Sequence, residues 1–481
     1  MSLLALSVSL VACVRPDDDA KSNDPTGPLG VTGFGDDVEI AADDGDSQAE
    51  PSTVALPDGT VLASWMQLDG YELYIHYARS TDNGATWSDS KTIDEDRWAY
   101  QNDPVLVQGG GYIYFSWLAV EGNNYDKSSI YCVDSTDGGV TWSDKVTLTE
   151  ANTFNDRQWM AVDDTGRAVV TWDLFENSSL TKQAYSVTDG GCAGFAEAKT
   201  IANGSFLNGV PAIGADGTIY ASRSEYDYSH EELNVIVSTE SDGGFDDETV
   251  FTQDVPYEVI AGRTAENPEE EHEETMEGIE RAREREEEGE GGVALDLDEL
   301  RVSPGMERAL FLAGSIEPKR LASADFDGFY SPILQPLPDN SLAIVTCAFE
   351  DGSDETPDVY YITYDGEDST HRVLNQDAAG IEQMEPWMVV DKWGGIHVSW
   401  FDAREDEWRL YGASSVDGGE TFTEYEIADD TFRKGFDDYD TYAWVGHFQG
   451  LTASDDHVIA VWGDSSEDST SRLMADASVG R

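Results

Sequence analysis

A short turn sequence recurs five times and constrains the fold of this chain more than any other feature. Three clear copies are STDNGATW at residues 80–87, STDGGVTW at 135–142 and SVDGGETF at 415–422. Two weaker copies, TDGG and SDGG, occupy residues 188–191 and 241–244. Asp82 and Asp137 lie 55 positions apart (137 − 82), which is about the length of one four-stranded propeller blade. Recurrence at such a period predicts a repeat architecture.

Each copy has the composition of a tight turn. An aspartate can hydrogen-bond its own backbone, and the following glycines accept a positive φ. The terminal Trp or Phe supplies an apolar contact beneath the turn. We therefore predict a structural role for the aspartates of these turns, which are Asp82, Asp137, Asp189, Asp242 and Asp417.

A longer sequence pattern also recurs along the chain, and this repeated phrase predicts two short antiparallel strands. Over residues 51–65, apolar residues alternate on both sides of a turn at Asp58 and Gly59, as they do in a β-hairpin. The phrase returns at residues 104–117, 159–172, 211–223, 332–346, 386–400 and 450–462. These seven units, without a convincing buried helix, predict an all-β chain, a β-propeller of four-stranded blades. Six or eight blades stay open as alternatives, and residues 38–40 are expected to complete the last blade as its outer strand.

The boxes of the form Ser/Thr-x-Asp-x-Gly-x-Thr-Trp/Phe give the chain a family resemblance. Over residues 37–481 it resembles the sialidase-like propellers with Asp-box (BNR) repeats. The resemblance implies a propeller fold, with six blades in the sialidases of the family. It implies less about function, because such propellers include glycosidases, glycan binders and assembly factors.

The chain is strongly acidic. It has 97 Asp and Glu residues against 28 Lys and Arg, a formal net charge of −69, which excludes nucleic acids and anionic membranes as electrostatic partners. We prefer adaptation to high salt as the explanation over a dedicated role in binding cations. A hydrophobic content of 40% indicates a folded chain rather than an acidic disordered one.

The first residues resemble a bacterial lipoprotein signal. The apolar run at residues 3–12 is too short to span a bilayer and is followed by Cys13. The resemblance implies a signal peptide over residues 1–13, lipidation of Cys13 and export to the cell envelope. No Lys or Arg precedes the apolar run, and a plain signal peptide is the alternative. Residues 14–36 are predicted to form a flexible tether to the propeller.

The remaining cysteines and one charged segment carry weaker predictions. Cys132, Cys192 and Cys347 show no metal-ligand spacing, and we expect Cys132 and Cys347 to be buried small side chains. Residues 262–300 contain a charged insertion, interpreted as a solvated helix or a disordered arm. No metal site or cofactor is predicted, a bound Ca²⁺ ion is left open, and a monomer is expected.

The predicted topology indicates which residues share the functional face. In the related propellers the Asp-box turns lie opposite the active site, so the connections into each inner strand and the loops between the second and third strands of each blade form the functional face. Sialidase chemistry implies three arginines that bind a carboxylate, a tyrosine nucleophile and an acid/base aspartate. The resemblance places the first arginine two residues before the proline of the inner strand, but the first unit reads Ala49-Glu50-Pro51, so that arginine is absent there. The candidate catalytic residues are Arg157, Arg223, Arg404, Asp103, Glu385 and Tyr442.

Each of these side chains could instead have a role unrelated to catalysis or ligand binding. The arginines have many carboxylates with which they could form salt bridges, and in so acidic a chain several carboxylates reach this face by chance. Those carboxylates are Glu50, Asp96, Asp103, Asp156, Asp173, Glu225, Glu385, Asp402 and Asp464. Aromatic side chains that suit the C–H face of a sugar, or that simply pack between strands, are Trp98, Tyr226, Trp408 and Trp444.

Together these patterns predict an exported propeller that binds or processes glycans. A sialidase-type exo-glycosidase is one alternative to this prediction. A non-enzymatic scaffold for protein interactions is the other.

Overall fold

The computed structural model describes residues 27–255 and 331–479, apart from gaps inside these ranges. The gaps are 42–46, 70–71, 96–99, 121–126, 150–152, 177–178, 205–206, 228–229, 231, 350–355, 378–379, 406, 433–447 and 466–470. The predicted signal peptide with Cys13, the charged insertion at 262–300, and Trp98, Tyr442 and Trp444 all lie outside the described residues. Among the described residues there is no helix with the length and apolarity needed to cross a bilayer.

The chain is all-β. The largest sheet has eight strands, which are β2 (Gln48–Ala55), β3 (Val61–Asp69), β4 (Glu72–Ser80), β5 (Lys91–Thr92), β6 (Tyr100–Gly109), β7 (Tyr112–Val120), β8 (Ser128–Ser135) and β9 (Val146–Thr147). The next sheet contains β10 (Phe154–Val162), β11 (Ala168–Glu176), β12 (Ser179–Thr188) and β13 (Lys199–Asn203), with the short 3₁₀ turn η1 (Cys192–Gly194) between the last two. A five-stranded sheet follows with β14 (Leu207–Asn208), β15 (Ala212–Ile213), β16 (Ile219–Asp227), β17 (Glu232–Ser241) and β18 (Gly244–Asp254).

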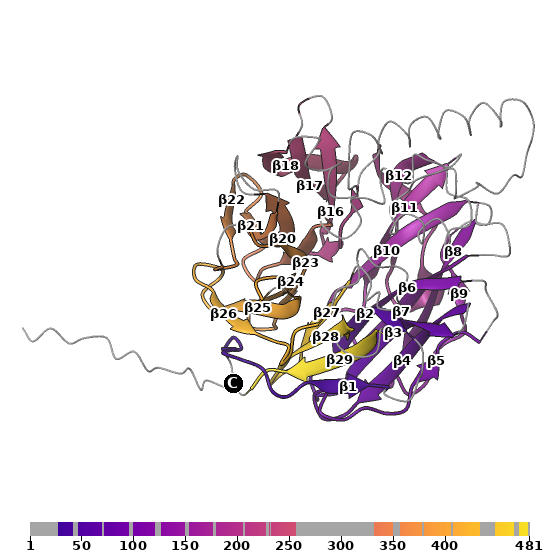
Figure 1. Cartoon of the computed structure of the whole chain (residues 1–481). Helices are drawn as coiled ribbons and strands as arrows, with labels where there is room; N and C mark the ends of the chain where they lie inside the picture. The colour runs from indigo at the N-terminus through magenta and orange to yellow at the C-terminus, as the bar shows by residue number, and fades with distance from the viewer. Residues whose placement is uncertain are drawn as a thin grey trace, which may run out of the picture.

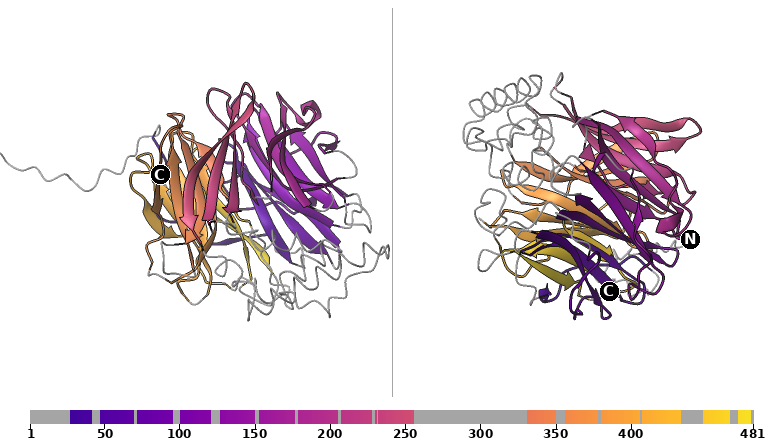
Figure 2. Two further views of the ribbon diagram at one scale, coloured as in Figure 1. Left: turned by 90° about the horizontal axis from the view of Figure 1, so that it is seen from above. Right: turned by 90° about the vertical axis from the view of Figure 1, so that its right-hand side faces the viewer.

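Three four-stranded sheets complete the molecule. Two of them follow the chain order, with β19 (Ile333–Pro336), β20 (Leu342–Phe349), β21 (Pro357–Tyr364) and β22 (Ser369–Val373), then β23 (Gln383–Val390), β24 (Ile396–Asp402), β25 (Arg409–Ser415) and β26 (Thr423–Glu426). The last sheet combines β27 (Gly450–Ala453), β28 (Val458–Asp464) and β29 (Arg472–Ala477) with β1 (Val38–Ile40). In Figure 2 the sheets follow one another around the molecule in chain order, and the indigo strands meet the yellow ones.

The structure confirms an all-β β-propeller, but its sheets number six among the described residues, which differs from the seven units predicted. The difference arises because β4 and β6 share one parallel residue pair, Leu73 with Tyr100, which merges the strands of two predicted units into the eight-stranded sheet. Each predicted two-strand phrase does coincide with an antiparallel pair, from β2 with β3 to β27 with β28.

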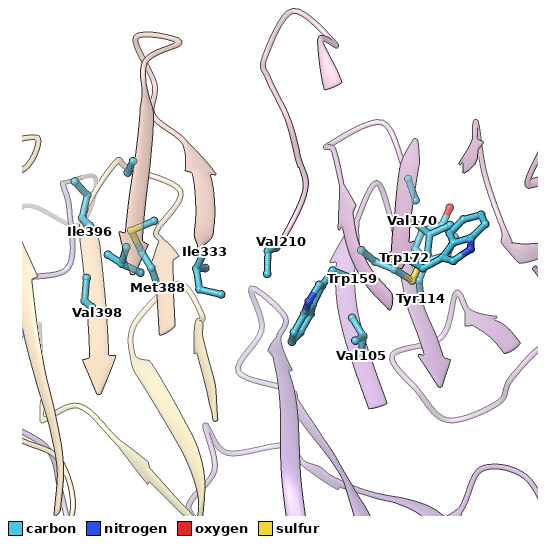
Figure 3. Close-up of a cluster of buried hydrophobic side chains, with 14 of the residues drawn as sticks. Val105, Tyr114, Trp159, Val170, Trp172, Val210, Ile333, Met388, Ile396 and Val398 are labelled. Carbon is cyan, nitrogen blue, oxygen red and sulfur yellow. The ribbon is translucent and has the colours of Figure 1, made fainter. Parts of the chain in front are cut away.

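Apolar residues of the repeated phrases form the packing between sheets. The tryptophans that end five of the phrases are fully buried, namely Trp65, Trp117, Trp172, Trp400 and Trp462. Figure 3 shows one buried cluster that extends from Ile396 and Met388 through Val210 to Trp159 and Val105. Its members come from sheets on different sides of the ring, so the core is shared between sheets.

The two ends of the chain close the ring, as predicted. β1 pairs antiparallel with β29 along three residue pairs, from Val38 with Ala475 to Ile40 with Leu473, and Figure 1 shows indigo β1 beside yellow β29. The segment before β1 also packs on the propeller. Leu29 is buried, and its N–H donates to Asp391 Oδ2 at 2.7 Å in the turn after β23.

The three clear copies of the repeated turn share one hydrogen-bond pattern. Asp137 accepts from the backbone N–H of Thr141 at 2.9 Å and from its hydroxyl at 2.6 Å, while the Ser135 hydroxyl donates to it at 2.8 Å. Asp82 and Asp417 make the equivalent contacts. These bonds to the charged form lower the pKa of Asp137 to about 2.

The two weaker copies depart from this pattern, which corrects their assignment as equivalent structural turns. At Asp189 the Thr188 hydroxyl accepts from Gly190 N–H at 3.1 Å and donates to Gly191 O at 2.9 Å. Asp242 lies in a tight hairpin between β17 and β18, where Ser241 pairs with Gly244. Both segments lack the Thr-Trp/Phe ending of the clear copies, so the threonine hydroxyl from which the aspartate would accept a hydrogen bond is missing.

One disulfide corrects the expected state of two cysteines. Cys132 of β8 is bonded to Cys192 of η1, with the Cα atoms 5.8 Å apart. Cys132 is buried as predicted, but as half of this bridge, and Cys347 is a buried thiol outside the bridge. The bridge joins strand β8 of one sheet to the turn η1 between two strands of the next sheet, a pairing that spacing alone does not show.

Candidate active site

Four inner strands carry the same backbone irregularity at the start of the strand. The pairing register shifts between Ala49 and Ser52 in β2, and at the equivalent places in β6, β10 and β23. At each shift one charged residue has a left-handed backbone, with φ of 52° at Glu50, 51° at Asp103, 50° at Arg157 and 53° at Glu385. Such a conformation costs a non-glycine residue about 1 kcal/mol or more. Its repetition with charged side chains therefore indicates a functional site, since bulges re-aim side chains.

Three of these residues meet across neighbouring inner strands. The carboxyl groups of Asp103 and Glu50 are hydrogen-bonded to each other, and the charges of Asp156 and Arg157 act on the same group. Burial raises the pKa of Asp103 well above its usual range, the negative charges of Glu50 and Asp156 raise it further, and Arg157 opposes them. Asp103 and Glu50 therefore form a pair that retains a proton at a pH where an ordinary aspartate has lost it.

Two glutamines fix the backbone of these irregular segments. Gln158 of β10 donates from Nε2 to the Asp103 carbonyl oxygen of β6. Gln449 donates from Nε2 to the Glu385 carbonyl oxygen at 2.7 Å. Both glutamines are buried, as is Glu385. Each bond links one inner strand to its neighbour in the ring, so the charged positions are held by two sheets at once.

Aromatic rings lie directly beyond the charged residues along the inner strands. The ring of Trp159 lies 5.2 Å from that of Trp387 and 4.9 Å from that of Phe448, measured between centroids. Trp159 and Trp387 also line an axial channel of about 360 Å³, bordered by β2, β6, β10, β19, β23 and β27 together with Val210. The channel lining begins two residues after each charged position, at Ser52, Val105, Trp159 and Trp387. The charged residues therefore lie just beyond the end of the channel where the inner strands begin, opposite the Asp-box turns.

Two of the three predicted arginines form salt bridges with carboxylates. Arg223 is buried, and donates from Nη2 to Asp247 of β18 at 2.8 Å. Arg404 pairs with Asp402 at 2.6 Å and with Glu424 of β26 at 2.7 Å. Salt-bridge formation, the alternative left open from the sequence, describes both. Each arginine contacts carboxylates of its own sheet, because in so acidic a chain partners are available on the adjacent strands.

Of the four predicted aromatic residues, the structure describes Tyr226 and Trp408. Trp408 forms a backbone bridge with Phe432 and packs against a buried cluster, so the packing interpretation fits it. Tyr226 lies in β16. Trp159, Trp387 and Phe448 were not predicted as part of the site. The signal that could have found two of them is their position two residues after a charged residue at the start of an inner strand, as in Arg157-Gln158-Trp159 and Glu385-Pro386-Trp387.

Comparison with known proteins does not assign the chain to a family. No family model matches the chain. A sialidase of Paraclostridium sordellii is 34% identical over 118 residues, which is 21% of this chain and 29% of the relative. The chain thus spans less than a third of that sialidase.

Solved structures resemble it at low sequence identity. A PL25 ulvan lyase gives a TM-score of 0.48 at 11% identity, over 93% of this chain and 94% of the lyase. The Hadza microbial sialidase Hz136 gives 0.43 at 12% identity, over 92% of this chain and 67% of the sialidase.

Proposed function

We propose that this chain is a glycan-processing enzyme, a glycoside hydrolase in which Asp103 is the proton donor. The observation that carries the proposal is the hydrogen-bonded pair of half-buried Asp103 and buried Glu50 beside Arg157, just beyond the end of the axial channel. Glycoside hydrolysis uses two carboxyl groups with separated roles, one of which keeps its proton near neutral pH. The partial similarity to a curated sialidase supports the same reaction class.

The residues around Asp103 suit that chemistry. Glu50 accepts a hydrogen bond from the protonated Asp103 carboxyl and so keeps the proton on it. When the glycosidic oxygen takes that proton, its bond to the sugar ring breaks, and the ionised carboxylates nearby stabilise the positive charge that develops on the ring. Water then adds to the ring carbon and its released proton restores the acid form of Asp103. The rings of Trp159, Trp387 and Phe448 supply apolar faces against which the C–H face of a sugar packs.

The charges favour a neutral sugar as substrate. Among the described residues, the charges that act on Asp103 are those of Glu50, Asp156 and Arg157, and Glu385 has the equivalent position on β23. Arg223 and Arg404 already bind carboxylates of their own sheets. A sialic acid carboxylate needs a surplus of positive charge, so the sialidase-type reaction is the second candidate. The partial sialidase similarity is the observation that favours it.

The test compares Asp103→Asn with Arg167→Ala on aryl glycosides of neutral sugars, on a sialoside and on a glycan array. Arg167 is a matched control, because it lies at the opposite end of the inner strands and donates to Gly217 O at 2.5 Å. We expect Asp103→Asn to lower kcat by about 10²–10⁴-fold with little change in glycan affinity, and Arg167→Ala to retain turnover.

Other outcomes select other functions. Turnover of the sialoside alone would favour the sialidase-type enzyme, and array binding without turnover would favour a glycan binder. If the protein shows neither turnover nor glycan binding, the protein-interaction scaffold remains as its function.

We also propose that the chain is exported and that Cys13 is its lipidated residue. The bridge between Cys132 and Cys192 supports export, because disulfides persist in oxidising compartments and are rare in the cytosol. The test is cell fractionation of the wild type and Cys13→Ser, with mass spectrometry of the mature N-terminus. Recovery of both proteins in the same soluble fraction would contradict lipidation, while a reduced Cys132 in the native protein would contradict export.

A further inference from the structure

Four buried carboxamide side chains occupy one repeated position on the inner strands. Each lies two residues before a charged residue with a left-handed backbone, and all four are at most 4% exposed. They are Gln48 before Glu50, Gln101 before Asp103, Asn155 before Arg157 and Gln383 before Glu385. Although 97 of the 481 residues are acidic, an amide is present at all four positions. This repetition indicates a role connected with the charged residue two positions later.

Each carboxamide reaches the third strand, counted from the channel, of the strands that precede it in the ring. Gln48 Oε1 of β2 accepts from the N–H of Leu473 in β29 at 2.8 Å. Gln101 Oε1 of β6 accepts from the N–H of Ile75 in β4 at 3.3 Å, and its Nε2 donates to Asp94 O at 3.3 Å. These bonds attach the start of each inner strand to the strands before it in the ring.

The other two carboxamides make the same connection. Asn155 Nδ2 of β10 donates to Ser128 O in β8 at 3.0 Å. Gln383 of β23 reaches β21 through one further side chain. Its Oε1 accepts from Asn375 Nδ2 at 3.2 Å, and Asn375 Oδ1 accepts from the N–H of Val359 in β21 at 3.0 Å. The connection is therefore present at all four strands, although the partners differ.

The left-handed residues need support of this kind. At each register shift the inner strand contains one residue more than its neighbour, so the left-handed residue falls outside the ladder of paired residues. A strained backbone persists only where the surrounding structure fixes it. The ladder resumes at Ser52 in β2 and at Val105 in β6, and the carboxamides of Gln48 and Gln101 hold these strands before the shift.

We propose that Gln101 and Gln48 are positioning residues that hold the carboxyl groups of Asp103 and Glu50 against each other. Both act through the backbone, because each fixes the strand two residues before the carboxyl group. An amide suits this role since it donates and accepts hydrogen bonds without a charge, whereas a further carboxylate would repel the pair. The catalytic consequence rests on the proposed function, in which Asp103 is the proton donor.

The test replaces Gln101 with methionine, which has a similar length but neither amide group. Gln183→Met is the matched control. Gln183 is also buried and donates from Nε2 to Ser222 O of the next sheet at 3.2 Å, but Tyr185, two residues later, does not have a left-handed backbone. The readout is the pH dependence of carbodiimide modification at Asp103, measured by mass spectrometry on the full chain, because carbodiimides modify protonated carboxyl groups.

We expect Asp103 in the wild type and in Gln183→Met to be modified up to a higher pH than an ordinary aspartate. In Gln101→Met the midpoint of modification should fall by about one pH unit, because Asp103 is no longer held against the charge of Glu50. Gln48→Met should shift the midpoint in the same direction, and it decides the test if Gln101→Met fails to fold. Where turnover is measurable, Gln101→Met should lower kcat about 10–100-fold with a smaller change in KM.

The proposal is overturned if the midpoint is unchanged in both Gln101→Met and Gln48→Met, since the carboxamides would then only stabilise the fold. It is also overturned if Gln183→Met produces an equal shift, or if the wild-type midpoint is that of an ordinary aspartate. The chemical readout needs no turnover, so it separates this proposal from the proposed function. If Asp103→Asn retains turnover while the midpoint falls in Gln101→Met, the positioning role holds and the assignment of Asp103 as proton donor fails.

Discussion

Removing the disulfide between Cys132 and Cys192 should destabilise the propeller by an amount that follows from its position in the chain. The two cysteines are 60 residues apart in sequence, and closing a loop of that length in the unfolded chain corresponds to about 4 kcal/mol at 25 °C in the chain-entropy model. Unfolding a chain of 481 residues has an entropy of roughly 1 kcal/mol/K. The double variant Cys132→Ala/Cys192→Ala should therefore melt about 4 °C below the wild type.

The assay is differential scanning calorimetry of the wild type and the double variant, each with and without a thiol reductant. Reductant present during unfolding should lower the Tm of the wild type toward that of the variant and leave the variant unchanged. Cys347 remains in both proteins, so its thiol does not contribute to the difference. The reasoning is refuted if the variant melts within a degree of the wild type, or if reductant shifts both proteins equally.

Three further predictions follow from the charges. Asp137→Ala should lower the Tm without changing glycan affinity in an array. Because the pKa of Asp137 is lowered to about 2 in the fold, the stabilisation is present above about pH 4 and lost as the pH falls toward 2; equal acid titrations of both proteins would contradict this. With a net charge of −69, the Tm should rise between about 0.01 M and 1 M salt as the Debye length falls from about 30 Å to 3 Å; a flat curve would indicate local compensation. Glu50→Gln removes a charge that raises the pKa of Asp103, so the alkaline limb of any residual pH–rate profile should move to lower pH, and an unmoved limb would exclude Asp103 as the acid.

The strands and the ring closure could be predicted because their signals are local. Alternation of apolar residues, as around Val54 and Trp65, indicates a strand with one face inside the protein. This pattern can be recognised without knowing which strands lie beside it. Residues 38–40 were assigned to the last sheet because a ring without a partner for β29 would leave an open edge. The merging of β4 and β6 through Leu73 and Tyr100 depends on how two sheets meet, which no local pattern records.

The site was predicted in part for the same reason. The repeat register placed Asp103, Arg157 and Glu385 at equivalent starts of inner strands, and the structure shows them there with the same left-handed backbone. Their roles depend on contacts between inner strands that are distant in sequence, such as the bond from Asp103 of β6 to Glu50 of β2. The same is true of Arg223, whose partner Asp247 lies 24 residues away on the outer strand of its own sheet. The spacing of charges along a chain does not indicate which of them meet.

The closing pair of β1 and β29 also has a consequence for how the chain folds. Val38 pairs with Ala475, so the last sheet is complete only after nearly the whole chain is available. Contacts between residues so distant in sequence raise the contact order, and proteins rich in such contacts fold slowly. Until the ends meet, the edges of β29 and its neighbours are exposed to other chains. We therefore expect a variant that lacks residues 1–41 to aggregate during refolding before it shows any loss of secondary structure.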